Sequence, residues 1–281
     1  MVIFKHSAQL TAFLIREKTT GKRIGFVPTM GALHNGHLSL IEQSKASCAL
    51  TVCSIFVNPT QFNQAEDLKK YPRTLEKDID LLEAAGCDIL FFPEVSEIYP
   101  ENYQSTHYDL GYLDKILEGK FRPGHFQGVC QVVDILLQIM KPHQLFLGEK
   151  DFQQCLVISK MIELKHPETE VKICPTKREP SGLAMSSRNL RLNEEEKIRA
   201  AAIYESLTFL KKNLATGPLH DLKSIALQKL TESGFHTEYL EICLSKDLSI
   251  IDTWDGKSPV VALLAAFMGE VRLIDNMRLY P

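Results

Sequence analysis

Short apolar runs alternate with helical patterns through the first two-thirds of this chain, and no other feature limits its fold as strongly. Runs with the length of buried strands lie at residues 23–28, 50–57, 87–92, 144–147 and 171–174. Helical patterns occupy residues 38–47, 74–85, 128–140 and 152–164. In the second of these, Leu75, Ile79 and Leu82 recur at the spacing of one buried helix face. Strands that alternate with helices build parallel βαβ units with helices on both faces of the sheet. We therefore expect an α/β fold with a Rossmann-like, doubly wound parallel sheet.

A different pattern begins after residue 176. Asn193 followed by three glutamates predicts a helix N-cap with an acid at the third position, and a helix to about residue 212. Gly217 and Pro218 end this helix and a second helix follows. Strand patterns then lie at residues 239–244, 260–267 and 271–274. We expect two domains, a Rossmann-like domain over residues 1–176 and a smaller C-terminal α+β domain over residues 177–281.

The charge and the cysteines argue against several classes of partner. The 281 residues carry a formal net charge of −3, which gives no electrostatic footprint for nucleic acid. The seven cysteines are scattered and mostly lie inside apolar runs, which predicts buried thiols in a reducing compartment. No stretch reaches the roughly 18 apolar residues of a membrane span, and no signal peptide is evident. We expect a cytoplasmic protein with no nucleic-acid and no membrane partner.

The turn His34-Asn35-Gly36-His37 is the first candidate for chemistry, because it joins a predicted strand to a predicted helix. Free backbone N–H groups and the helix dipole favour a phosphate at such a place. Two imidazoles three residues apart can donate hydrogen bonds to phosphate oxygens and stabilise charge that develops on phosphorus. The structural alternative is that one histidine caps the helix and the other fills a polar gap. Zinc is a weaker alternative, because no third ligand with suitable spacing is evident.

The second candidate is the loop that contains Ser186, Ser187 and Arg188. Small hydroxyl residues before an arginine make a loop that can surround a triphosphate, with Arg188 as a forked cation. Alone this motif is typical of an ordinary solvated turn. Paired with the histidine turn, it predicts an enzyme that holds ATP and cleaves it at the α-phosphate.

Longer sequence blocks follow one another in order along nearly the whole chain. They lie at residues 26–37, 56–62, 71–74, 121–128, 148–154, 182–189 and 272–276. This set resembles the pantothenate synthetase (pantoate–β-alanine ligase) family of the nucleotidyltransferase superfamily, which also includes class I aminoacyl-tRNA synthetases. The resemblance implies that ATP, (R)-pantoate and β-alanine give pantothenate, AMP and diphosphate through a pantoyl adenylate. It also implies Mg²⁺, which arrives with ATP, and a homodimer formed through the first domain. The first domain would bind nucleotide and pantoate, and the second would close over the ATP site.

The family's roles can be carried onto matching positions. Residues implied to line the ATP site are Met30, Gly31, Ala32, Leu33, His34, Asn35, Gly36, His37, Gly148, Glu149, Lys150, Asp151, Lys177, Met185, Ser186, Ser187 and Arg188. Those implied to be catalytic are His34, His37, Lys150, Ser186, Ser187 and Arg188, with His37 at the position assigned as proton donor. Gln61 and Gln154 are implied to bind pantoate, with Gln61 bordering the β-alanine site. Lys177 stands where the family usually has an apolar residue that contacts adenine through its backbone. The resemblance implies that this backbone contact survives the change, whereas the side-chain packing is expected to differ. No metal ligand is assigned.

Other interpretations of the sequence remain open. Residues 122–125 and 71–73 are second-rank candidates, and the polar segment 63–73 either closes over the site or is an ordinary exposed loop. A nucleotidyltransferase acting on a different small acceptor is the main functional alternative. Gln61 and Gln154 argue against it, since a phosphorylated acceptor calls for extra cations there. A tRNA-dependent function fits less well, because no basic stripe or anticodon-binding helical domain is evident.

Overall fold

A computed structural model describes residues 1–63 and 65–280 of the chain, and it divides into two compact units. The first unit comprises Met1–Glu149 and Gln153–Pro175. The second unit begins at Thr176 and also takes in the short segment Lys150–Phe152.

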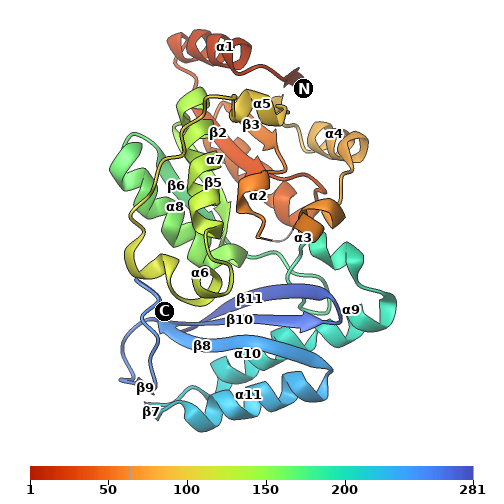
Figure 1. Ribbon diagram of the computed structural model, residues 1–281, viewed down its shortest axis with the longest axis vertical. Coiled ribbons are helices and arrows are strands. Elements are labelled where there is room, and N and C mark those ends of the chain that lie inside the picture. The colour runs from red at the N-terminus through yellow and green to blue at the C-terminus, as the bar shows by residue number, and fades with distance from the viewer. Residues whose placement is uncertain (64, 281) are drawn as a thin grey trace. The chain divides into compact units, whose positions relative to one another are not determined.

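The first unit is built on a six-stranded, wholly parallel sheet with the strand order β1-β4-β3-β2-β5-β6 (Figure 1). Its strands are β1 (Val2–Phe4), β2 (Ile24–Thr29), β3 (Leu50–Ile55), β4 (Ile89–Phe91), β5 (Gln144–Gly148) and β6 (Glu170–Cys174). The chain runs outward from β2 to β3 and β4, then returns to place β5 on the other side of β2. The strand order therefore reverses between β2 and β5, which is where ligands bind in sheets of this kind.

Helices cover both faces of this sheet, as a doubly wound fold requires. The helices of this part of the chain are α1 (Ser7–Thr19), α2 (Asn35–Ser47), α3 (Ala65–Lys70), α4 (Leu75–Ala84), α5 (Val95–Ile98), α6 (Leu117–Phe121), α7 (His125–Met140) and α8 (Phe152–Lys165). Short 3-10 turns are η1 (Pro59–Gln61), η2 (Gly111–Asp114) and η3 (Glu149–Asp151). Phe26 and Leu145 pack with α1, α7 and α8, whereas their neighbours Val27 and Phe146 pack with α2 and α4. Alternate residues of one strand thus serve two cores, and the expected Rossmann-like, doubly wound fold is confirmed.

The N-terminal elements β1 and α1 were not expected from the sequence. Val2 and Ile3 are about half exposed in β1, and on α1 only Leu10 and Leu14 are buried. An edge strand of three residues and a helix with a thin apolar stripe give little periodic signal. Pairing with β4 is what makes Val2–Phe4 a strand.

A buried carboxylate, Asp134 on α7, joins three segments of the first unit. It accepts hydrogen bonds from Tyr108 Oη at 2.7 Å, Lys165 Nζ at 2.9 Å, His166 Nε2 at 2.7 Å and Gln138 Nε2 at 2.9 Å. Burial alone would raise the pKa of Asp134, but the four donors outweigh it and lower the pKa to about 2. Asp134 therefore stabilises the fold through its ionised form.

We expect Asp134→Asn to lower the free energy of unfolding by roughly 2 kcal/mol at pH 7, from the linkage of the lowered pKa to stability. A pKa below the unfolded value of 3.8 means that this stabilisation is present above pH 4 and is lost as the pH falls toward 2. Urea unfolding at pH 7 and pH 3 measures both effects. The exposed Asp80 on α4 provides the control, since Asp80→Asn should change neither value. Equal losses at the two pH values would contradict the assignment.

The second unit is an α+β arrangement around a three-stranded antiparallel sheet in the order β11-β10-β8, packed against α10 and α11. Its elements are η4 (Ser187–Arg191), α9 (Glu194–Ala200), α10 (Ala202–Asn213), β7 (Gly217–Pro218), α11 (His220–Glu232), β8 (Phe235–Leu244), β9 (Thr253–Trp254), β10 (Val260–Met268) and β11 (Val271–Tyr280). The capping box at Asn193 is confirmed, with Asn193 Oδ1 accepting the Glu196 N–H at 2.9 Å and the Glu196 carboxylate accepting the Asn193 N–H at 2.9 Å. The expectation of one helix to about residue 212 is wrong. The Ala201 N–H bonds to the Ile198 carbonyl three residues back, and this tightening separates α9 from α10.

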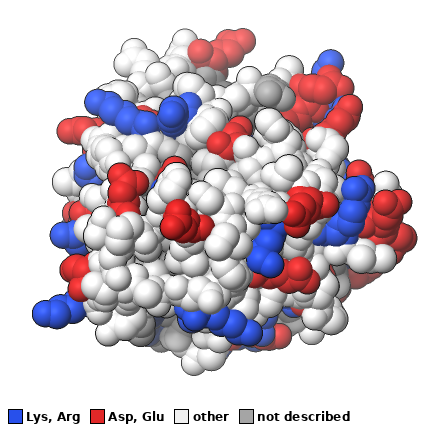
Figure 2. Space-filling model, turned by 90° about the horizontal axis from the view of Figure 1, so that it is seen from below, with Lys and Arg blue, Asp and Glu red and all other residues white. Residues whose placement is uncertain are grey.

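The surface over α10 and α11 carries both signs of charge. Figure 2 shows lysines and arginines interspersed with aspartates and glutamates on this face. All seven cysteines are free and buried, in agreement with their expected role as small core residues. Across residues 1–63 and 65–280, no helix is both long and apolar enough to cross a membrane.

Candidate active site

The histidine turn lies at the switch point of the sheet. β2 ends at Thr29 and α2 begins at Asn35, so the predicted strand–turn–helix arrangement is confirmed. β5, the strand beside β2, ends at Gly148, where the sequence block 148–154 with Lys150 begins. Because the carboxyl ends of parallel strands lie at the same edge of a sheet, these two motifs follow neighbouring strands at the edge that binds ligands.

The two histidine side chains cap the start of α2 through their Nδ1 atoms. His34 Nδ1 accepts the Gly36 N–H at 3.1 Å, and His37 Nδ1 accepts the His34 N–H at 3.4 Å. The ring centroids lie 4.0 Å apart. In a neutral imidazole the accepting nitrogen carries no proton, so these contacts assign the ring proton to Nε2 in both residues. The capping role and the chemical role are therefore compatible, because Nδ1 serves the backbone and Nε2–H is the donor suited to a phosphate oxygen.

Backbone N–H groups of His34, Gly36 and His37, and of the two residues before the turn, donate hydrogen bonds within the protein, so these groups are not the free phosphate donors that the sequence suggested. The N–H groups of Ala32 and Leu33 donate to the two carboxylate oxygens of Asp78, at 2.9 and 2.8 Å. The His37 N–H donates to the His34 carbonyl at 2.8 Å. The N–H groups of Ala32, Leu33 and His37 therefore already have acceptors inside the protein.

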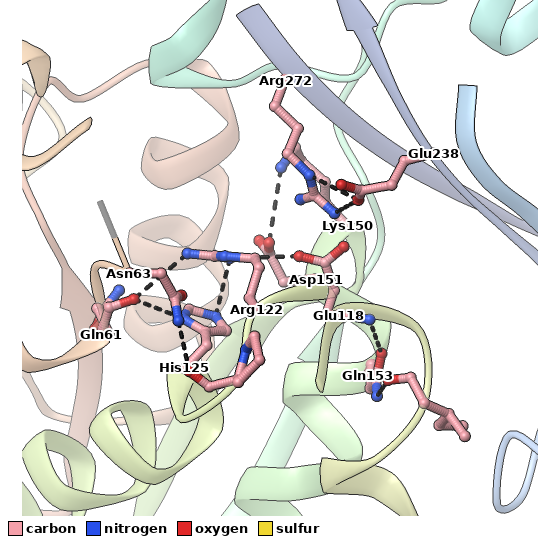
Figure 3. A network of polar contacts seen from close by, with 12 residues as sticks. Gln61, Asn63, Glu118, Arg122, His125, Lys150, Asp151, Gln153, Glu238 and Arg272 are labelled. Carbon is pink, nitrogen blue, oxygen red and sulfur yellow. Dashed lines mark hydrogen bonds and ion pairs between the residues drawn. The ribbon is translucent and has the colours of Figure 1, made fainter. Parts of the chain in front are cut away.

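Gln61 ends the 3-10 turn η1 and is held in place by its neighbours (Figure 3). Asn58 Nδ2 donates to Gln61 Oε1 and to the Gly128 carbonyl, both at 3.1 Å. The Gln61 carbonyl accepts a hydrogen bond from His125 Nδ1 at 2.8 Å, and Arg122 lies 3.1 Å from His125 Nε2. Arginine can only donate, so His125 carries its proton on Nδ1, the opposite tautomer to that of the histidine turn. Arg122 and His125, second-rank candidates from the sequence, thus support the Gln61 turn.

The adjacent glutamines of α8 have different surroundings. Gln153 is buried; its Oε1 accepts the Glu118 N–H at 3.1 Å, and its Nε2 donates to the carbonyls of Leu113 and Ile116 at 2.7 and 3.0 Å (Figure 3). Gln154 is half-buried and, one residue further along the helix, points about 100° away. Gln153 therefore holds the 113–118 segment, whereas Gln154 lies on a different side of the helix and is half-buried.

In the second unit, a turn brings Lys177 and Met185 together. The Met185 N–H donates to the Lys177 carbonyl at 3.0 Å. Lys177 is exposed, whereas Met185 is half-buried. The Lys177 carbonyl, part of the backbone expected to contact adenine, thus already accepts a hydrogen bond within the turn. The lysine side chain is exposed.

This turn is anchored by Arg178, which was not singled out from the sequence. Arg178 forms a two-pronged ion pair with Asp275, at 2.6 and 3.0 Å, and also donates to the Gly182 carbonyl at 3.0 Å. Burial raises the pKa of Asp275, and the Arg178 guanidinium opposes that rise. Asn276 Nδ2 donates to the Lys150 carbonyl at 2.8 Å. The C-terminal sequence block therefore fixes both the 177–185 turn and the backbone of Lys150.

The serine–arginine motif begins the 3-10 helix η4. Ser186 Oγ accepts the Arg188 N–H at 3.3 Å as the cap of η4. Ser187 is buried, while Ser186 and Arg188 are half-buried. Lys150 Nζ lies 3.7 Å from Asp151 Oδ1. No group of three or more His, Cys, Asp or Glu side chains that could hold a metal ion occurs in the part of the chain that the structure describes.

A doubly wound parallel sheet with a two-histidine turn at its switch point defines an α/β nucleotide-binding enzyme. Within that class, the sequence matches the Pantoate-beta-alanine ligase family over residues 2–278, and the chain belongs to this family. A pantothenate synthetase of Bacteroides fragilis (strain YCH46) is 45% identical over 262 residues, 93% of either chain. The crystal structure of pantothenate synthetase from Thermus thermophilus is 38% identical, with a TM-score of 0.89 and 100% of both chains covered.

Another similar solved structure is that of a ligand complex. It is a pantoate-beta-alanine ligase from Francisella tularensis complexed with beta-gamma ATP and beta-alanine, 38% identical to this chain. The similarity covers 99% of this chain and 98% of that one, with a TM-score of 0.84.

Proposed function

We propose that this chain condenses (R)-pantoate with β-alanine at the expense of ATP, and that residues of the histidine turn, the two glutamines and the serine–arginine loop carry the reaction. The observation that carries the proposal is the family match over residues 2–278, which spans the histidine turn, both glutamines and the serine–arginine loop. The Francisella relative, described with beta-gamma ATP and beta-alanine, supports ATP and β-alanine as two of the substrates.

In the first step, a carboxylate oxygen of pantoate attacks the α-phosphorus of ATP. A new P–O bond forms, the bond to the bridging oxygen breaks, and diphosphate leaves with the electron pair. Nε2–H groups of His34 and His37 donate to the phosphate oxygens as negative charge builds up on them. Lys150, Ser186, Ser187 and Arg188 supply further donors and positive charge to the triphosphate.

In the second step, the β-alanine amine attacks the acyl carbon of pantoyl adenylate. A C–N bond forms, AMP leaves as the C–O bond breaks, and the amine nitrogen loses a proton. Adenylation makes this possible because AMP is a far better leaving group than the oxide of a free carboxylate. Gln61 and Gln154 hold pantoate for both steps, since an amide can donate to its carboxylate and accept from its hydroxyls.

Isotope exchange between diphosphate and ATP tests this assignment. Exchange should require pantoate and proceed without β-alanine, because the first step alone makes and reverses diphosphate release. Exchange that other hydroxy acids support equally well would remove pantoate as the substrate. Exchange that needs no acid at all would favour a nucleotidyltransferase of another kind.

We expect Gln154→Ala to raise KM for pantoate about tenfold, because it removes hydrogen bonds to a bound polar ligand. KM for ATP should stay close to its original value. Gln153→Ala is the matched control, since its three hydrogen bonds lie within the protein, and it should lower thermal stability with less effect on pantoate. Steady-state kinetics with pantoate as the varied substrate measures both variants. Unchanged pantoate saturation in Gln154→Ala contradicts the role of this residue.

Magnesium belongs to this proposal as part of the substrate, since ATP binds as its magnesium complex. The described residues offer no cluster of carboxylates for the ion, so ATP phosphates and water would hold it. Measuring the diphosphate–ATP exchange rate against ATP concentration at several magnesium concentrations tests this. The rate should follow the concentration of the magnesium–ATP complex and not that of free ATP.

The remaining assignments rest on the family resemblance. The chain would form a homodimer through its first domain, residues 1–176, and the second domain would close over the ATP site during the reaction. Segment 63–73 would act as a flap; residue 64 lies outside the described residues, and Tyr71 packs edge-on against Phe62 with ring centroids 5.7 Å apart. The seven buried thiols support a reducing, cytoplasmic compartment. Light scattering of the purified protein tests the dimer.

A further inference from the structure

We propose that Asp78 is a positioning residue that holds the histidine turn in the geometry needed to bind phosphate. The proposal deepens the function assigned above and rests on it. Asp78 lies on α4 and is only 1% exposed. Its carboxylate accepts three hydrogen bonds, from the Ala32 and Leu33 N–H groups and from Thr74 Oγ1 at 3.1 Å.

The backbone beneath this carboxylate has a conformation that needs support. Gly31 and Ala32 have φ values of 78° and 48°, so two consecutive residues adopt left-handed backbone. For an alanine this conformation is strained in the absence of compensating contacts, because its Cβ approaches the following carbonyl oxygen. The two hydrogen bonds to Asp78 directly follow this bend. They link it to α4, while Thr29 Oγ1 accepts the Gly31 N–H at 3.3 Å from the strand side.

The same contacts decide which groups of the turn are available to a nucleotide. A loop of this kind ordinarily presents its amides to an anion. Here the side-chain carboxylate of Asp78 already accepts the N–H groups of Ala32 and Leu33, the two residues immediately before His34. Asp78 thereby fixes where α2 starts, and with it the positions of the two Nδ1 contacts that assign the ring protons to Nε2. The phosphate is left to the imidazoles.

Asp78→Asn tests this inference, because the amide has nearly the same shape but presents an NH₂ group to one of the two backbone N–H donors. We expect the rate of pantoate-dependent diphosphate–ATP exchange to fall at least about tenfold, since small displacements of catalytic groups are costly. Nitrogen-15 NMR of the histidine side chains should show His34 and His37 with unprotonated Nδ1 in the original protein. In Asp78→Asn that single tautomer should be lost.

Asp134→Asn is the matched control, another buried carboxylate replaced on a helix that packs on the opposite face of the sheet. It should lower stability while leaving the exchange rate and the histidine tautomers unchanged. The inference is overturned if Asp78→Asn keeps the original exchange rate and tautomers. It is also overturned if the two variants lose exchange in the same proportion.

A second variant covers the case in which Asp78→Asn does not fold. Gly31→Ala keeps the carboxylate but would place a Cβ 3.1 Å from Asp78 Oδ2 and 3.1 Å from Ile55 Cγ2, at a left-handed position. It should cause the same loss of exchange and of the single tautomer, and retention of both would contradict the inference. The NMR measurement separates the two proposals: absence of pantoate-dependent exchange in the original protein removes the proposed function, whereas the tautomers report on Asp78 alone.

Discussion

Replacing His37 with alanine is expected to lower kcat roughly 10²- to 10⁴-fold, the usual range for removing a general acid or a preorganised donor to charged oxygen. The fold should survive. His37 is half-buried at the start of α2, and its contact with the backbone is a long one, 3.4 Å from the His34 N–H to Nδ1. Losing one helix-capping contact costs about 1 kcal/mol, which is small beside the kinetic effect. Turnover and thermal unfolding of the same preparation measure the two quantities.

His37→Gln separates the capping role from the catalytic role. A glutamine at the third helical position can reach back to the N-cap N–H, as in a capping box, but it has no imidazole. We expect this variant to recover stability without recovering kcat. Recovery of turnover by glutamine, or a loss of only a few-fold in His37→Ala, would make His37 a structural cap.

The sequence alone predicted the position of this turn but not how it is held. The strand before it, the helix after it and the sheet around it follow from apolar periodicity, because these are local patterns. The sequence does contain a signal for Asp78, because this residue lies between Leu75 and Leu82 on the spacing of the buried helix face. A carboxylate on a buried stripe must have partners. Which partners it finds depends on how α4 packs, and periodicity does not contain that information.

The second unit shows the same limit more clearly. The 182–189 motif predicted a nucleotide loop, and the structure anchors the turn before it through Arg178 and Asp275, 97 residues apart in the chain. Neither residue stands out in its own segment, since arginines and aspartates are common on surfaces. The pairing becomes visible only when β11 is placed in the sheet. The adjacent Gln153 and Gln154 cannot be told apart from the sequence for a related reason. Both are glutamines, and only the surroundings of α8 determine that the Gln153 amide bonds within the protein.

Gly128→Ala is expected to raise KM for pantoate about a hundredfold, through displacement of Gln61. Gly128 lies in the first turns of α7, against the 3-10 turn η1 that carries Gln61. A Cβ at this position would meet the Thr60 carbonyl oxygen at 2.4 Å and the Gln61 backbone nitrogen at 2.8 Å. Both atoms belong to backbone, so the whole turn must shift, and the Asn58 contact to the Gly128 carbonyl must shift with it.

The sign of the effect on stability makes this substitution informative. Alanine in place of glycine favours an exposed helix interior by about 1 kcal/mol, so helix propensity alone predicts a more stable protein with unchanged kinetics. The contact of the added Cβ with the Thr60 carbonyl oxygen at 2.4 Å predicts the opposite, a displaced turn with weaker pantoate binding. Steady-state kinetics with pantoate as the varied substrate distinguishes the two expectations. Gln127→Ala is the matched control: it removes the side-chain hydrogen bonds to Tyr108 and Asp114 one residue earlier on α7. It should lower stability while leaving KM for pantoate unchanged. If Gly128→Ala keeps the original pantoate KM, then the position of Gln61 does not govern pantoate binding, and the amide has to be reassigned to support of η1.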